Sequence, residues 1–153
     1  MAGDIHQVEI CWFLPEAERD LFVPRYETAG ASGLDVQAAI SETVVIAPGE
    51  IVLIPTGFGV ALPEGYEFQV RPRSGLAVKY GIGIANSPGT IDADYRGEIR
   101  IALINFSRNP YPVHRGERIA QLVLAEVSRV SWREVERLPE SSRGAGGFGH
   151  TGR

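Results

Sequence analysis

One short segment combines an arginine, a serine and a glycine where an apolar stretch gives way to a predicted helical turn. Arg73 can form charge-assisted hydrogen bonds with an anion, and the Ser74 hydroxyl can donate another. Gly75 follows, and the unpaired N–H groups at a helix start suit a phosphate. The alternative is an ordinary helix cap, with Ser74 as the capping residue beside a surface arginine. The segment alone leaves phosphate binding and capping open.

A second polar segment, residues 86–98, contains a Ser-Pro-Gly turn near its start and a Gly-Glu pair at its end. It predicts a β-hairpin whose backbone donors and acceptors can read the edge of a planar base. Asp92 and Asp94 would share one face of an extended stretch and could hold a water or a metal. Tyr95 offers a ring for stacking. The alternative is a solvated loop with acidic side chains.

Two further segments place polar groups where a plain core would have none. Gln121 interrupts an apolar stretch and could either contact a ligand or satisfy a buried neighbour. Residues 143–152 are rich in glycine and contain Arg143 and Phe148. Because glycine permits close backbone approach, this segment could wrap around an anion. The alternative is a disordered chain end.

Short strands must position these groups, because turn residues recur along the whole chain. The 18 Gly and 10 Pro make up roughly 18% of 153 residues, against about 12% in average proteins. Their even spread favours an all-β domain over a helical bundle. One short helix is expected to begin at Ser74 and end at Gly81, and a weak helix or strand at residues 132–138. Strands are expected at residues 43–46, 51–56, 58–62, 66–71, 98–106 and 119–127.

Length and composition limit the class of protein further. The length fits one domain, and a hydrophobic fraction of 44% excludes a disordered chain. A net charge of −4 without a basic run argues against a nucleic-acid partner. Cys11 is the only cysteine, and no signal peptide is recognisable, so a cytoplasmic location is expected. Proline and glycine break the most apolar region, residues 44–62, so no membrane span is expected.

The order and spacing of five segments resemble the motifs of the homotrimeric dUTP diphosphatase (dUTPase) family. The segments are residues 31–36, 73–77, 89–98, 116–121 and 143–152. The resemblance implies an all-β fold, a distorted jelly roll or β-clip barrel with one short helix. Residues 1–140 would form the single domain. Residues 141–153 would form a flexible glycine-rich flap that closes over a neighbouring subunit's site.

The resemblance also implies a reaction, the Mg²⁺-dependent hydrolysis of dUTP to dUMP and pyrophosphate, which keeps uracil out of DNA and supplies dUMP. Asp92 would activate the water that attacks the α-phosphorus. Asp35 would support Mg²⁺ through water, with no direct protein ligand. The implied substrate-binding residues are Arg73, Ser74, Gly75 and Gln121 at the α- and β-phosphates; Asn86, Gly89, Thr90, Ile91 and Tyr95 at uracil and deoxyribose; and Arg143, Gly147, Phe148, His150 and Thr151 in the flap.

Family resemblance further implies that three subunits of the trimer share each site. The first, second and fourth motifs would come from one subunit, the third from another and the fifth from the last. Glycines such as Gly75, Gly97 and Gly147 would let the backbone approach the nucleotide. His150 stands where the family usually has serine, which would make a γ-phosphate contact pH-sensitive. The side chains expected to face a threefold interface as well as the core are Ile99, Ile101, Leu103 and Ile119.

Two alternatives to this enzyme remain. A dCTP deaminase of the same superfold is the nearest, although the Asp92 segment differs from the deaminase pattern. The other is a nucleotide-sensing regulatory module that has lost catalysis, against which the intact Asp92 and Arg73 argue.

Overall fold

Short apolar stretches separated by turns form eleven strands in the computed structural model, which describes residues 5–148. The strands are β1 (Glu9–Trp12), β2 (Leu34–Gln37), β3 (Val44–Ile46), β4 (Ile51–Pro55), β5 (Phe58–Ala61), β6 (Tyr66–Arg71), β7 (Ile82–Ile84), β8 (Gly89–Ile91), β9 (Arg100–Asn105), β10 (Tyr111–Val113) and β11 (Arg118–Glu126). Within these residues α1 (Ser74–Tyr80) is the only α-helix, and η1 (Glu16–Glu18) is a 3-10 turn. The prediction of an all-β fold with one short helix is confirmed.

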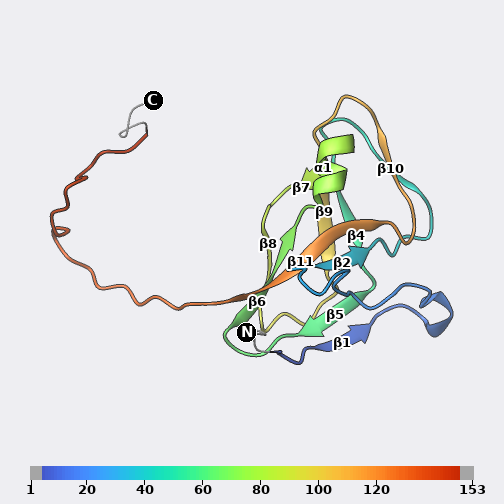
Figure 1. The fold of residues 1–153 in the computed structure, drawn as a ribbon, viewed down its shortest axis with the longest axis horizontal. Helices are drawn as coiled ribbons and strands as arrows, with labels where there is room; N and C mark the ends of the chain where they lie inside the picture. Colours follow the sequence, from blue (N-terminus) through green and yellow to red (C-terminus); the bar gives the residue numbers. More distant parts are fainter. Residues whose placement is uncertain (1–4, 149–153) are drawn as a thin grey trace.

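The strands pair in antiparallel sheets, and β11, the longest strand, lies inside the largest of them (Figure 1). A four-stranded sheet has the order β2-β11-β6-β8, and a three-stranded sheet has the order β4-β9-β7. Two-stranded pairs, β1 with β5 and β3 with β10, complete the body. β11 lies between β2 and β6. Residues from three separate chain segments therefore lie side by side across the sheet.

The apolar core lies between the sheets, and it contains the four side chains that were predicted to face a threefold interface as well. Ile99, Ile101, Leu103 and Ile119 are at most 1% exposed within the single chain, so they pack in its own core. They cannot reach a threefold interface. The apolar side chains that do remain exposed include Ile51, Leu53 and Phe106, which are 56%, 59% and 71% exposed.

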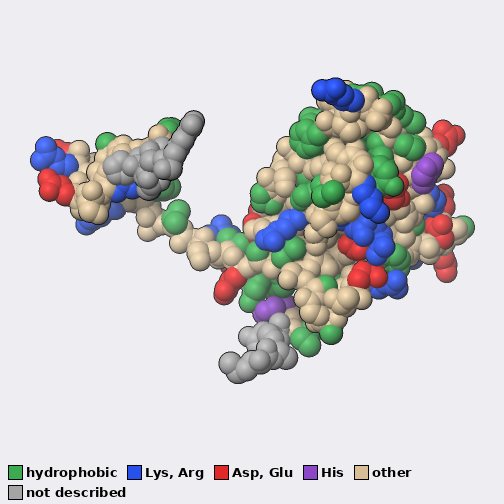
Figure 2. Space-filling view, turned by 45° about the horizontal axis from the view of Figure 1, so that its top comes forward, with side chains coloured by type: hydrophobic (Ala, Val, Ile, Leu, Met, Phe, Trp, Pro, Cys, Tyr) green, Lys and Arg blue, Asp and Glu red, His purple; other side chains and the backbone are tan. Residues whose placement is uncertain are grey.

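The six predicted strands and the helix are confirmed, with ends that shift by one or two residues. The sequence did not predict β1, β2, β7, β8 or β10. The element expected at residues 132–138 is wrong, because residues 127–148 contain no helix or strand. This segment instead leaves the body as an extended arm (Figure 1 and Figure 2). Across residues 5–148, no helix has both the length and the apolar character needed to cross a membrane.

Arg115 makes hydrogen bonds that hold the N-terminal segment around Glu18 and Asp20 against the body. Its Nη2 donates to Asp20 Oδ1 at 2.6 Å and to the Glu18 carbonyl at 2.7 Å, while Nη1 donates to the Ile40 carbonyl at 3.0 Å. The hydrogen bond from Arg115 lowers the pKa of the Asp20 carboxyl. Residues around η1 are therefore held against the turn that precedes β11.

Candidate functional site

The chain between β6 and α1 holds Arg73 in a fixed orientation. Arg73 has an extended backbone (φ −90°, ψ 127°) and occupies the position before the helix, where no side chain makes a capping hydrogen bond. Its Nε donates to Asp35 Oδ1 at 3.3 Å, and its Nη1 donates to the Arg118 carbonyl at 3.1 Å. The expectation that Ser74 caps the helix is therefore wrong. Ser74 is the first helical residue and is exposed.

Asp35 on β2 lies between two arginines. Arg118 Nη1 donates to Asp35 Oδ2 at 3.1 Å, opposite the contact from Arg73, and also lies 3.6 Å from Glu27 Oε2. The Asp35 side chain is only 14% exposed, against 26% for Arg73. Charges in such a half-buried place require partners. Because Asp35 and a main-chain carbonyl each accept one N–H of Arg73, the guanidinium is held in place and its remaining N–H groups can donate to another acceptor.

Gln121 lies in the middle of the same sheet, opposite Asp35 on β2 and Arg71 on β6. Its Nε2 donates to the Pro72 carbonyl at 3.0 Å and so braces the connection that carries Arg73. A Cβ at Gly33 would lie 2.9 Å from Gln121 Cδ, so only glycine leaves room for this amide. The sequence did not predict this role for Gly33, although the residue lies within the first motif-like segment, residues 31–36. The second N–H of Nε2 can still donate to a ligand.

Residues 86–95 do not form the predicted hairpin. β8 pairs with β6, Val70 opposite Gly89, whereas β7 pairs with β9 in the other sheet. The side chain of Asn86 lies beside β8, because a Cβ at Gly89 would lie 3.3 Å from its Nδ2. Thr90 is exposed and Ile91 is half-buried. The residues expected at the base therefore do gather at one strand, on the edge of the four-stranded sheet.

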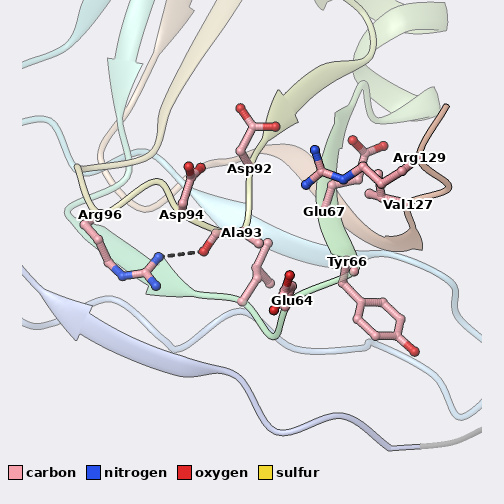
Figure 3. Close-up of a pocket in the computed structure, with 11 residues that line it drawn as sticks. Glu64, Tyr66, Glu67, Asp92, Ala93, Asp94, Arg96, Val127 and Arg129 are labelled. Atoms are coloured by element: carbon pink, nitrogen blue, oxygen red, sulfur yellow. Dashed lines mark hydrogen bonds between the residues drawn. The ribbon is translucent and has the colours of Figure 1, made fainter. Parts of the chain in front are cut away.

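Asp92 follows β8 in a tight turn. The Tyr95 N–H donates to the Asp92 carbonyl at 3.1 Å, so Asp92 and Asp94 do not lie on an extended stretch as predicted. Both nevertheless line a hollow of about 690 Å³, together with Glu67 and Arg129 (Figure 3). Asp92 also lines a second hollow of about 320 Å³ with Thr90, Ile91 and Tyr95. Its carboxylate makes no hydrogen bond to any residue in the described range 5–148.

The structure separates the arginine cluster, which consists of Arg73 and Arg118 around Asp35, from Asp92. Phe68 pairs with Ile91, so Asp92 lies near Glu67, whereas Arg73 lies beyond the other end of β6. The four steps of strand from Glu67 to Arg71 span about 13 Å at about 3.3 Å per residue, and Arg73 lies two residues beyond them. Arg73, Ser74, Gly75 and Gln121 thus form one group, and the residues from Asn86 to Tyr95 form another.

The arm brings none of Arg143, Gly147 and Phe148 to either group. Arg143 Nε donates to the Gly146 carbonyl at 2.7 Å, and Phe148 is fully exposed. Gly147 has no atom of this chain within 4 Å of its Cβ position. His150 and Thr151 lie outside the described residues.

The donor groups of the described residues do not form a metal cage. Among residues 5–148, no three His, Cys, Asp or Glu side chains are grouped so that they could hold a metal ion. Each Asp35 oxygen accepts an arginine N–H, yet a carboxylate oxygen has a second lone pair with which it can accept a water.

Comparison with known proteins gives consistent matches. The dUTPase family model matches residues 19–152. Deoxyuridine 5'-triphosphate nucleotidohydrolase of Desulfotalea psychrophila is 56% identical over 146 residues, which is 95% of this chain and 97% of that protein.

Solved structures are similar as well. The dUTPase of Staphylococcus bacteriophage 80alpha with dUpNHpp has a TM-score of 0.81 and 26% identity, over 97% of this chain and 100% of that one. A mutant dUTPase of phage phi11 of S. aureus, described with a structural Mg(II) ion, has a TM-score of 0.74 and 25% identity, over 88% and 100%.

Loss of the Asp35 carboxylate is predicted to destabilise the fold, because Arg73 and Arg118 would then lack the negative charge between them. We expect Asp35→Ala to lower the free energy of unfolding by about 1–3 kcal/mol, a value reduced for partial exposure. Urea denaturation at fixed protein concentration measures it. Part of the loss should disappear at high salt.

The matched control is Asp94→Ala, which removes an exposed carboxylate that makes no ion pair within residues 5–148. Its effect should stay within about 0.5 kcal/mol. Equal stability of the two variants would contradict the role given to Asp35.

Proposed function

This chain belongs to the dUTPase family and is a dUTP diphosphatase, and we propose that an Asp92-activated water attacks the α-phosphorus of dUTP. The products are dUMP and pyrophosphate, so the reaction keeps uracil out of DNA and supplies dUMP. The observation that carries the proposal is the position of Asp92, whose carboxylate has no partner within residues 5–148 and lines two hollows. We propose that the enzyme is cytoplasmic, because a chain with a single cysteine forms no intrachain disulfide and is compatible with a reducing compartment.

The proposed step needs a base and a fixed geometry. The Asp92 carboxylate accepts a proton from the water while the water oxygen bonds to the α-phosphorus. The bond from this phosphorus to the bridging oxygen breaks, and its electron pair leaves with pyrophosphate. The turn closed by the Tyr95 N–H holds the main chain of Asp92 in place.

Arg73, Gln121, Ser74 and Gly75 are proposed to bind the α- and β-phosphates. Asp35 and the Arg118 carbonyl orient Arg73 before substrate arrives, which lowers the entropy lost on binding. Gln121 can add its second N–H, and Ser74 its hydroxyl. A Cβ at Gly75 would meet no atom of this chain, so a phosphate can approach the backbone there.

Mg²⁺ is the proposed cofactor and would neutralise charge on the triphosphate oxygens when bound. Its first ligands would be substrate oxygens and waters. Asp35 is the carboxylate beside Arg73, and its remaining lone pairs can accept a hydrogen bond from such a water.

The uracil and sugar are proposed to lie along β8. Asn86 and the backbone of Gly89, Thr90 and Ile91 would bind the base edge. Tyr95 would pack against the deoxyribose and exclude a 2′-hydroxyl. This assignment is supported by the gathering of these residues at one edge strand beside the Asp92 turn.

A homotrimer with shared sites is proposed because Asp92 follows β8 beside the start of β6, whereas Arg73 follows the end of β6. The two groups of one chain are therefore separated by most of the length of that strand. Exposed apolar side chains such as Leu53 and Phe106 are available for subunit contact. The arm would carry Arg143, Gly147, Phe148, His150 and Thr151 to a neighbour's site, Phe148 over uracil and Arg143 with Thr151 at the γ-phosphate.

The proposed function predicts that the enzyme discriminates among nucleotides. With Mg²⁺, pyrophosphate should be released from dUTP and hardly at all from dTTP, dCTP or UTP, and chelation of Mg²⁺ should abolish most release. A coupled pyrophosphate assay measures this. Ammonia release from dCTP would instead identify a deaminase, and tight dUTP binding without turnover would identify a sensing module.

Asp92→Asn should keep substrate affinity and lose turnover by at least about 100-fold, because only the base is removed. Affinity is measured with the non-hydrolysable analogue dUpNHpp, and turnover by pyrophosphate release. Asp94→Asn, two residues away in the same turn, is the matched control and should retain turnover. Full activity of Asp92→Asn would refute the mechanism.

Shared sites predict complementation between two inactive variants. Asp92→Asn retains the flap, and a chain ending at residue 140 retains Asp92, so mixed trimers can assemble some complete sites. Activity should reappear when the two variants are unfolded and refolded together, up to about one site in three. Light scattering should give a trimer for both variants. A monomer, or no recovery from a verified mixed trimer, would contradict the proposal.

A further inference from the structure

The Tyr95 ring is held by contacts within its own loop. Its hydroxyl donates to the Glu98 carbonyl at 2.9 Å. A Cβ at Gly97 would lie 2.6 Å from Tyr95 Cζ and 3.1 Å from Cε2, so the ring lies directly on the Gly97 backbone. The side chain is still 44% exposed and lines the hollow of about 320 Å³ beside Asp92. The ring is therefore fixed from behind and open toward the site.

Glu98 fastens this loop to the β4–β5 turn. The Gly57 N–H donates to Glu98 Oε1 at 3.0 Å, and Arg100 Nε donates to Glu98 Oε2 at 3.3 Å. The Gly97 carbonyl packs against the backbone of Gly59, since a Cβ there would lie 2.6 Å from that oxygen. The side chain of Glu98 thus fixes the carbonyl that holds the Tyr95 hydroxyl.

A side chain that excludes a single hydroxyl group from a binding site must be held rigidly. The 2′-hydroxyl is the only difference between the sugars of UTP and dUTP, and a ring that moved by about an ångström would admit it. Nothing else within residues 5–148 donates to or accepts from the Tyr95 hydroxyl. The rigidity of the ring therefore depends on the two residues that follow Arg96.

We propose that Gly97 and Glu98 are positioning residues that set the discrimination of this enzyme between deoxyribose and ribose nucleotides. Gly97 provides the flat surface on which the ring lies, and Glu98 anchors the acceptor of its hydroxyl. This inference rests on the proposed function, in which Tyr95 packs against the sugar.

The test compares kcat/KM for dUTP and UTP in matched variants. Gly97→Ala adds a methyl group that must displace the ring, so the dUTP/UTP ratio should fall at least about tenfold, mainly through a lower KM for UTP. Gly30→Ala is the matched control, because its new methyl meets no atom within 4 Å, and it should keep the wild-type ratio.

Two further variants keep the test decisive if Gly97→Ala does not fold. Tyr95→Phe removes only the hydroxyl and should lower the ratio in the same direction by a smaller factor. Glu98→Ala removes the acceptor for Gly57 and should also lower it. Glu98→Gln keeps an oxygen for that N–H and should restore most of the ratio, which a loss of general stability would not do.

A wild-type ratio in both Tyr95→Phe and Glu98→Ala, in an enzyme that discriminates, would overturn the role of Gly97 and Glu98. A wild-type enzyme that turns over UTP as well as dUTP would instead contradict the sugar-binding role of Tyr95. The two failures are therefore distinguishable.

Discussion

The register of β11 between β2 and β6 is the constraint on which the arginine cluster depends. It sets Gln121 opposite Asp35 on one side and Arg71 on the other. Arg118 at the start of β11 then reaches Asp35 with its side chain and Arg73 with its carbonyl. A shift of one residue would turn every side chain of β11 to the other face of the sheet. The apolar pattern that buries Leu122 therefore also orients the groups proposed to bind phosphate.

The same sheet separates the two groups of residues that are proposed to form the site. Antiparallel pairing of β8 with β6 carries Asp92 toward Glu67, away from the end of β6 that leads to Arg73. Asp92 and Arg73 thus lie toward opposite ends of β6. In the proposed trimer, assembly of copies would bring Asp92 of one chain to the Arg73 group of another, which adds a geometric argument to family likeness.

The sequence predicted those parts of the fold that have a local signal. Tyr66, Phe68 and Val70 alternate with polar residues, and β6 was predicted with the right bounds. β7 and β8 have only three residues each, too few for a period to appear. The hairpin at residues 86–95 was wrong because a strand's partner is a non-local property. Asp35 was singled out by its motif, but its arginines lie 38 and 83 positions away and have no local signature.

Glycines show the same distinction at single positions. At Gly33 and Gly97 an added Cβ would lie too close to the side chain of Gln121 or Tyr95, so an alanine there would force that side chain to move. The expectation that Gly97 serves backbone approach to the nucleotide stays a prediction, and its contact with the Tyr95 ring is a second reason for glycine there. At Gly75 and Gly147 a Cβ would meet nothing in this chain. Internal packing therefore does not require glycine at these two positions. The proposed shared site gives glycine a role at these positions, because a bound nucleotide or a neighbouring subunit would approach the backbone there.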